Sequence, residues 1–179
     1  MTMIFTESEI KPLLSEDKIQ AGIKALAEKL NEKYKDEEVY LICVLKGSVM
    51  FMVDLAKHLT MPVKMEFIRL SSYGSGTTSS GKVNAVDIKL PDLNGKNVLI
   101  IEDIIDTGHT AKFLMDFLHQ NFKFKDLKFC ALLDKKVKRA TNIEADYYCF
   151  EVDDKYLVGY GLDIDGNYRN LTYIGYIEV

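Results

Sequence analysis

The sequence predicts an α/β fold built on a twisted, mainly parallel β-sheet flanked by helices. Apolar runs of strand length recur at 39–44, 63–70, 98–101 and 127–133. Between them lie stretches whose apolar residues repeat at helical spacing, such as 111–122. Continuous apolar runs are typical of strands covered on both faces, and their alternation with helices favours parallel crossover connections.

The individual elements follow from capping residues and apolar spacing. Ser15, followed by Glu16 and Asp17, has the composition of a helix start, and an apolar stripe follows. The loop 71–81 is rich in Ser, Gly and Thr, which indicates a lid or an insertion. The predicted order is a helix from Ser15, a strand at 39–44, a helix at 50–56, strands at 63–70 and 98–101, a helix at 111–122, a strand at 127–133, and short strands at 147–152, 156–160 and 173–179. We expect the last three to extend the sheet and to form a small hood.

Length and composition indicate one globular domain, residues 1–179, because 47% of the residues are hydrophobic. We expect a core at about 36–150 and a hood formed by the N-terminal segment and about 151–179. The first twenty residues carry charges that exclude a signal peptide, and no stretch has membrane-spanning length, so we expect a cytoplasmic protein with no membrane contact. The net charge of −4 argues against nucleic acid as a partner.

The cysteines and the basic run at 135–139 have structural rather than functional interpretations. Cys43, Cys130 and Cys149 form no C-x-x-C pair and lie in apolar runs, which favours reduced core thiols. For the basic run considered alone, a solvated loop is the default interpretation.

The segment 98–111 carries the strongest functional signal. Glu102 and Asp103 follow an apolar strand, where ligands of open α/β sheets bind. Thr107, Gly108 and Thr110 then lead into a helix, whose free N–H groups favour an anion such as phosphate.

Helix capping is the alternative explanation of this segment, and it accounts for the threonines. It does not account for three acids so close together, Glu102, Asp103 and Asp106, because like charges repel unless a cation or hydroxyl groups compensate them.

The run from Val98 to Ala111 resembles the phosphoribosyl pyrophosphate (PRPP) motif of the type I phosphoribosyltransferases. The resemblance implies the type I phosphoribosyltransferase fold. It also implies that Glu102 and Asp103 hold the ribose hydroxyls and that residues 106–110 wrap the 5′-phosphate. These last are Asp106, Thr107, Gly108, His109 and Thr110, with His109 a loop residue rather than a base; Asp106 is implied as the catalytic carboxylate facing purine N7.

Two further segments resemble the pyrophosphate loop and the lid of the hypoxanthine-guanine branch of this family. Leu45, Lys46, Gly47 and Ser48 match the pyrophosphate loop, for which the family implies a cis peptide before Lys46. The stretch 71–84 matches the catalytic lid, with Ser72 and Tyr73 as its site residues.

Three more matches concern the base, the pyrophosphate and the metal. The resemblance places Lys135 against the purine 6-oxo group, Tyr156 against the purine ring and main chain near Leu157 at its 2-position edge. Arg169 lies near pyrophosphate. The implied cofactor is Mg²⁺, with the acidic residues Glu102, Asp103 and Asp163 as its site.

The resemblance implies an enzyme of purine salvage that transfers the phosphoribosyl group from PRPP to N9 of hypoxanthine or guanine, as a homodimer or homotetramer. A sensor with this fold and a xanthine-preferring transferase remain alternatives. The Gly-Lys pairs at 81–82 and 95–96 are not followed by Ser or Thr, which excludes a P-loop kinase, and the spacing of Gly74 to Gly81 excludes a Rossmann fingerprint. The sequence leaves the base preference and the oligomeric state open.

Overall fold

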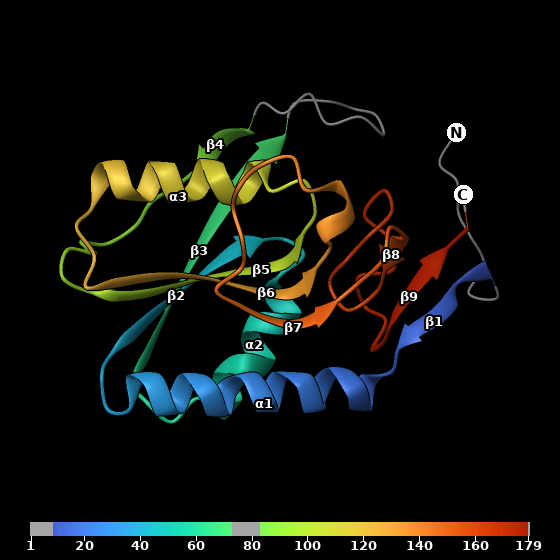
Figure 1. Ribbon diagram of the computed structural model, residues 1–179, viewed down its shortest axis with the longest axis horizontal. Coiled ribbons are helices and arrows are strands. Elements are labelled where there is room, and N and C mark those ends of the chain that lie inside the picture. The colour runs from blue at the N-terminus through green and yellow to red at the C-terminus, as the bar shows by residue number, and fades with distance from the viewer. Residues whose placement is uncertain (1–8, 73–82, 179) are drawn as a thin grey trace.

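A computed structural model of the protein describes residues 9–72 and 83–178, and it contains a six-stranded sheet in the order β4-β3-β2-β5-β6-β7 (Figure 1). Neighbouring strands are parallel except for β3 and β4, which are antiparallel. The mainly parallel sheet predicted from the sequence is therefore confirmed. Its strands are β2 (Val39–Leu45), β3 (Val63–Ser72), β4 (Val83–Asp87), β5 (Asn97–Ile105), β6 (Asp126–Asp134) and β7 (Tyr147–Glu151).

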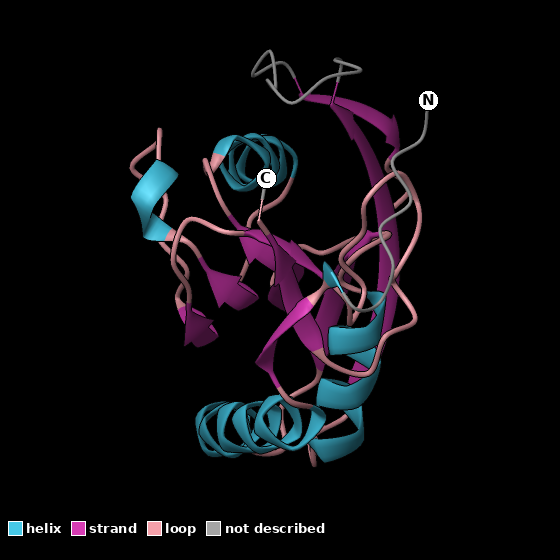
Figure 2. Ribbon diagram, turned by 90° about the vertical axis from the view of Figure 1, so that its right-hand side faces the viewer, coloured by secondary structure: helices cyan, strands magenta, loops and turns pink. Residues whose placement is uncertain are grey.

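Helices cover both faces of this sheet. Helices α1 (Glu16–Tyr34) and α2 (Val49–His58) lie on one face and α3 (His109–Asn121) lies on the other (Figures 1 and 2). Because side chains alternate along a strand, β5 sends Leu99 and Ile101 into the core under α1 and α2, and Val98 and Ile100 into the core under α3. Two hydrophobic layers thus hold β5 at the centre of the molecule.

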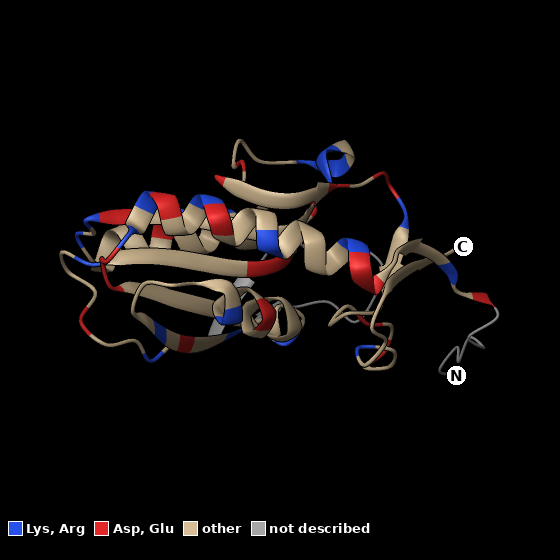
Figure 3. Cartoon of the chain, turned by 90° about the horizontal axis from the view of Figure 1, so that it is seen from below, with Lys and Arg blue, Asp and Glu red and all other residues tan. Residues whose placement is uncertain are grey.

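The predicted helix at Ser15 is confirmed, and it packs closely on the sheet. The Ser15 hydroxyl accepts a hydrogen bond from the backbone N–H of Lys18 at 3.4 Å. One turn later Gly22 lies against the Phe150 ring, where any Cβ would overlap it. The exposed face of α1 carries charges of both signs (Figure 3).

A second, three-stranded sheet in the order β1-β9-β8 forms the hood. Its strands are antiparallel and have their own small core of Ile10, Val158, Ile164 and Ile177. It lies beyond the carboxyl ends of the main strands (Figure 1). β7 extends the main sheet, so the predicted late strands serve both sheets. The strands of the hood are β1 (Lys11–Leu14), β8 (Tyr156–Val158) and β9 (Ile174–Ile177).

Three sequence-based expectations need correction. β1 and β4 were not predicted, and β5 continues to Ile105, so Glu102 and Asp103 lie inside the strand rather than after it. The basic run is not a solvated loop throughout. The side chains of Lys135 and Arg139 are 7% and 8% exposed, whereas the 3-10 turn η2 (Lys136–Lys138) between them is exposed.

The remaining expectations concern the cysteines, membrane segments and the lid. Cys43, Cys130 and Cys149 are free thiols, and the first two are buried, as the sequence predicts. No helix within the described ranges is long and apolar enough to cross a membrane. Residues 73–82 of the expected lid, Tyr73 among them, lie outside the described residues, while Ser72 ends β3.

Candidate active site

A pocket of about 240 Å³ lies at the carboxyl end of β5, beside the start of α3. The expectation that Glu102 and Asp103 face a crevice is confirmed, although apolar side chains supply much of its wall. The residues that line it are Glu102, Asp103, Ile104, Ile105, Asp106, Thr107, Gly108, Thr110, Ala111 and Phe129.

The two acids at the end of β5 are poorly compensated. Glu102 Oε2 is buried without a hydrogen-bond partner, and burial, with the neighbouring Asp103 charge, raises the pKa of Glu102 well above its ordinary value. Burial raises the pKa of Asp103 to about 6, although its Oδ1 accepts a 2.8 Å hydrogen bond from the Ile104 N–H. Carboxylates in this state have unused capacity for a cation or for hydroxyl donors.

The loop after β5 exposes the N-terminus of α3. Gly108 has a φ of 84°, in the left-handed region, and no side chain caps the helix that begins at His109. A Cβ at Gly108 would overlap the Thr141 hydroxyl, so glycine suits both its backbone conformation and its packing. The His109 N–H makes only a long contact of 3.5 Å with the Thr107 hydroxyl, so the N–H groups at the start of α3 retain capacity to bind an anion.

Lys135 enters the site from the end of β6. Its backbone N–H donates to the Ile105 carbonyl at 2.9 Å, which fixes it beside β5. Its Nζ lies 3.5 Å from Asp106 Oδ2, while Asp106 Oδ1 is buried without a hydrogen bond. The Asp106 side chain is 41% exposed, with Oδ2 near the Lys135 cation and Oδ1 buried in the protein.

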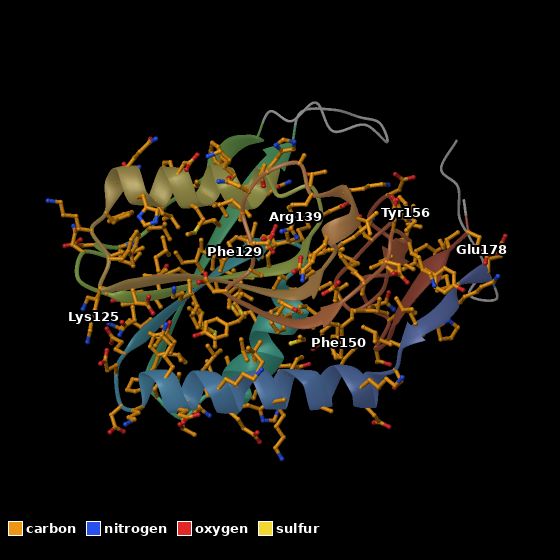
Figure 4. The ribbon with its side chains drawn as sticks, viewed as in Figure 1. Lys125, Phe129, Arg139, Phe150, Tyr156 and Glu178 are labelled. Atoms are coloured by element: carbon orange, nitrogen blue, oxygen red, sulfur yellow. The ribbon has the colours of Figure 1, made fainter. Side chains whose placement is uncertain are left out.

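Arg139, labelled in Figure 4, contacts the loop after β5, and all three of its guanidinium nitrogens contact oxygens inside the protein. Nε donates to the Asp106 carbonyl at 3.1 Å and Nη1 to the Ile143 carbonyl at 2.6 Å, while Nη2 pairs with the buried Asp134 carboxylate. Arg139 thus braces the backbone of the loop. The pairing of Asp134 with Arg139 was not predicted from the sequence. Its signal there is an acid, Asp134, at the end of an apolar strand and an arginine five residues later.

The loop between β2 and α2 lies against the acids. The Leu45–Lys46 peptide is cis, as the resemblance implies. Gly47 lies so close to Asp103 that any Cβ would overlap its carboxylate. Ser48 is buried and its hydroxyl donates to the Val44 carbonyl at 2.7 Å, so it stabilises the loop. Lys46 is exposed and forms no ion pair with the described residues.

A tight backbone segment joins the hood to this loop. Gly159, Tyr160 and Gly161 all have positive φ, and a Cβ on Gly161 would overlap the Gly47 carbonyl. The Tyr160 hydroxyl donates to Asp54 Oδ2 on α2 at 2.6 Å. These contacts hold the hood segment against the β2–α2 loop.

Arg169 and Asp163 form an ion pair beside that segment. Arg169 Nη1 donates to the Gly161 carbonyl at 2.6 Å, and its Nη2 lies 2.6 Å from Asp163 Oδ1. In the part of the chain that is described, no three Asp, Glu, His or Cys side chains form a ready-made metal cage. Asp163 therefore does not join Glu102 and Asp103 in a protein-only metal site.

Of the site residues predicted from the sequence, Glu102, Asp103, Asp106, Thr107, Gly108 and Thr110 line the pocket, and Gly47 and Lys135 lie against two of these acids. His109 does not line the pocket, and Ser48 faces the protein interior. Tyr156 is 47% exposed on β8 (Figure 4), and its neighbour Leu157 is buried. Phe129 was missed as a pocket residue because an aromatic inside an apolar strand reads as core.

Comparison with known proteins agrees with the fold. The model of the phosphoribosyl transferase domain matches residues 10–165. Hypoxanthine-guanine phosphoribosyltransferase of Bacillus subtilis is 44% identical over 168 residues, covering 94% of this chain and 93% of that protein. The corresponding Streptococcus pneumoniae protein is 43% identical over 173 residues, covering 96% of each.

Solved structures agree as well. A hypoxanthine-guanine phosphoribosyltransferase of Bacillus anthracis superposes with a TM-score of 0.89 at 42% identity, covering 95% of this chain and 100% of that one. A hypoxanthine phosphoribosyltransferase of Staphylococcus aureus superposes with a TM-score of 0.90 at 38% identity, covering 96% of this chain and 93% of that one.

Proposed function

The chain belongs to the phosphoribosyltransferase family, and from this premise we propose that it transfers the phosphoribosyl group of PRPP to N9 of hypoxanthine and guanine. The products are IMP or GMP and pyrophosphate, so the reaction is one of purine salvage. The observation that carries the proposal is the pocket itself: two buried, poorly compensated acids, Glu102 and Asp103, lie beside the N-terminus of α3.

The core side of the pocket binds the phosphoribosyl group. The N–H groups at the start of α3 and the hydroxyls of Thr107 and Thr110 bind the 5′-phosphate, because a helix N-terminus favours an anion. Glu102 and Asp103 accept hydrogen bonds from the ribose hydroxyls. The buried oxygen of Glu102 then gains the partner that it lacks in the free protein.

The acids also suit Mg²⁺. A hard cation prefers carboxylate oxygens and commonly binds through one or two carboxylates together with substrate phosphates, so the absence of a three-residue cage among the described residues fits it. Glu102 and Asp103 would hold the ion, together with Asp163 through water. When bound, the ion would supply positive charge that stabilises the departing pyrophosphate.

Three further groups orient the leaving pyrophosphate and the base. Lys46 and the amides of its loop bind pyrophosphate, together with Arg169. Lys135 donates to the 6-oxo group, and a 6-amino base is rejected because two donors then face each other. Tyr156 stacks on the purine, while main chain near Leu157 meets its 2-position edge.

Asp106 handles the proton of the purine. The Asp106 side chain is 41% exposed, and its carboxylate accepts the proton shared at purine N7 as N9 attacks C1 of the ribose. Lys135 lies near Oδ2 and offsets the charge of the carboxylate. No covalent enzyme intermediate is required.

We also propose that the protein acts in the cytoplasm as a homodimer or homotetramer. Free cysteines fit a reducing compartment. Met50 and Val53 on α2, and Met65 and Phe67 on β3, are 40–46% exposed, which supports a contact with another copy. Light scattering of the purified chain measures the mass directly, and a monomer at all concentrations contradicts the assembly.

The test is nucleotide formation from PRPP with hypoxanthine, guanine, xanthine and adenine in parallel, with and without Mg²⁺. We expect magnesium-dependent turnover of hypoxanthine and guanine and none of adenine. The xanthine rate decides whether the chain prefers that base instead. Binding of PRPP without turnover of any base would contradict an enzyme and favour a sensor.

A further inference from the structure

We propose that Asp154 is a positioning residue that holds the ammonium group of Lys135 in place for the 6-oxo group of the purine. This inference rests on the proposed function. It concerns a residue just before β8, whose role follows from its contacts. Lys135 Nζ lies 2.9 Å from Asp154 Oδ1, which is nearer than Asp106 Oδ2 at 3.5 Å or the Lys155 carbonyl at 3.3 Å.

Asp154 and Asp106 hold Lys135 from two different parts of the fold. Asp106 follows β5 in the core, whereas Asp154 belongs to the segment that leads into the hood. An ammonium group has three donors, and here each faces one of these three oxygens. The purine 6-oxo group must replace one of these three acceptors, and the weakest contact is the easiest to replace. That contact is the one to Asp106, which at 3.5 Å is the longest of the three.

Without Asp154, Asp106 is the only carboxylate of the described ranges that lies within ion-pair distance of the Lys135 ammonium. The cation is then free to move onto Asp106, which is also the acceptor proposed for the N7 proton. Such a contact removes Lys135 from the 6-oxo position and occupies Asp106 with a cation. Asp154 thus keeps the two recognition groups of the base apart.

A second lysine restrains Asp154. Lys138 Nζ lies 3.0 Å from the same oxygen, Asp154 Oδ1, and the hydrogen bonds from Lys135 and Lys138 lower the pKa of Asp154. Lys136, in the same turn η2, lies 2.9 Å from Glu151 Oε2 at the end of β7. Because Asp154 is 37% exposed and Lys138 is 55% exposed, this contact adds little to overall stability. Its effect is therefore expected on base binding.

The first measurement compares Asp154→Asn with the unaltered chain by steady-state kinetics. We expect the KM for hypoxanthine to rise about tenfold, the equivalent of one charge-assisted hydrogen bond, while kcat falls less than KM rises. The KM for PRPP should stay within about twofold. Asp154→Glu, which retains the charge, should recover most of the loss.

The control is Glu151→Gln, which breaks an ion pair of the same length on the neighbouring strand. Glu151 Oε2 lies 2.9 Å from Lys136 Nζ, and neither residue touches the pocket. We expect its kinetic constants to match those of the unaltered chain. Equal losses in Glu151→Gln and Asp154→Asn would overturn a specific role for Asp154.

A double-mutant cycle separates positioning from general structure. If Asp154 acts through Lys135, Asp154→Asn should have no further effect on kcat/KM for hypoxanthine in a Lys135→Met background. A full, additive loss in that background would overturn the inference, as would an unchanged KM for hypoxanthine in Asp154→Asn. If the unaltered chain turns over no 6-oxopurine, the proposed function fails and the inference falls with it.

Discussion

Two ends of the candidate site are built by different means. The core end, residues 102–110, follows from a buried central strand and the start of a helix, and it leaves Glu102 Oε2 and Asp106 Oδ1 without hydrogen bonds. The hood end, residues 154–169, is made of short strands and turns held by ion pairs and close backbone contacts. Unpaired polar atoms can remain where a rigid scaffold supports them, whereas a small lobe needs its polar contacts to stay in position.

The ion pairs of the two ends offer the largest contrast in stability. Arg139→Met leaves the Asp134 carboxylate buried with little compensation, so we expect a loss of about 3–5 kcal/mol in the free energy of unfolding. Arg169→Met breaks a pair whose side chains are 30% and 28% exposed, and the loss should be about 1 kcal/mol or less. Urea unfolding measures both. Equal losses would erase the contrast between the two ends.

The contact between the hood end and the β2–α2 loop can be broken by adding one methyl group. Gly161→Ala combines a left-handed φ of 98° with overlap of the Gly47 carbonyl, so we expect a loss of about 3 kcal/mol and a weaker pyrophosphate site. Gly166→Ala is the matched control, because Gly166 has a φ of 84° but open space around it. It should cost about 1 kcal/mol. Thermal unfolding of the pair shows whether overlap, rather than φ alone, carries the cost.

Chemistry at the core end depends on Asp106. Asp106→Asn keeps the shape of the side chain and removes its ability to accept a proton. We therefore expect kcat to fall about a hundredfold, with the KM for PRPP little changed. Initial rates at saturating hypoxanthine measure this. An unchanged kcat would remove Asp106 from the mechanism.

The uncompensated acids should also make stability depend on pH. The pKa of Asp103 is raised to about 6 from its ordinary 3.8, so the folded chain binds this proton more tightly than the unfolded chain does. Stability contributed by the group is present at low pH and is lost as the pH rises through about 4 to 6. Asp103→Asn should therefore be more stable by about 1–2 kcal/mol at pH 8, with a gain that shrinks toward pH 4.

Urea unfolding across this pH range checks the expectation, and Mg²⁺-dependent PRPP binding by Asp103→Asn should be lost in parallel. A gain that is the same at pH 4 and pH 8 would show that the carboxylate charge is not its cause.

Local pattern explains what the sequence could predict at the core end. A continuous apolar run followed by a Thr-Gly segment predicts β5, the start of α3 and an anion site between them. The residues that specify these features are adjacent in the chain. The end of β5 was placed too early because acids rarely continue a buried strand. A pocket supports Glu102 and Asp103 there.

The hood end was harder to predict. β1 has four residues and pairs with β9 near the other end of the chain, so its sequence alone carries almost no strand signal. The contacts of Arg139 with Asp134 and of Asp154 with Lys135 depend on tertiary placement. The cis peptide at Leu45–Lys46 was expected only through a family resemblance, since no local pattern specifies it.

The most direct test of this division is the dissociation constant of magnesium-bound PRPP for Tyr156→Ala, measured by calorimetry without any base. If the core end binds the phosphoribosyl group and Tyr156 serves only the purine, the constant should stay within about twofold of that of the unaltered chain. A tenfold weaker affinity would contradict the account, because it would mean that the base-binding side of the hood also holds PRPP.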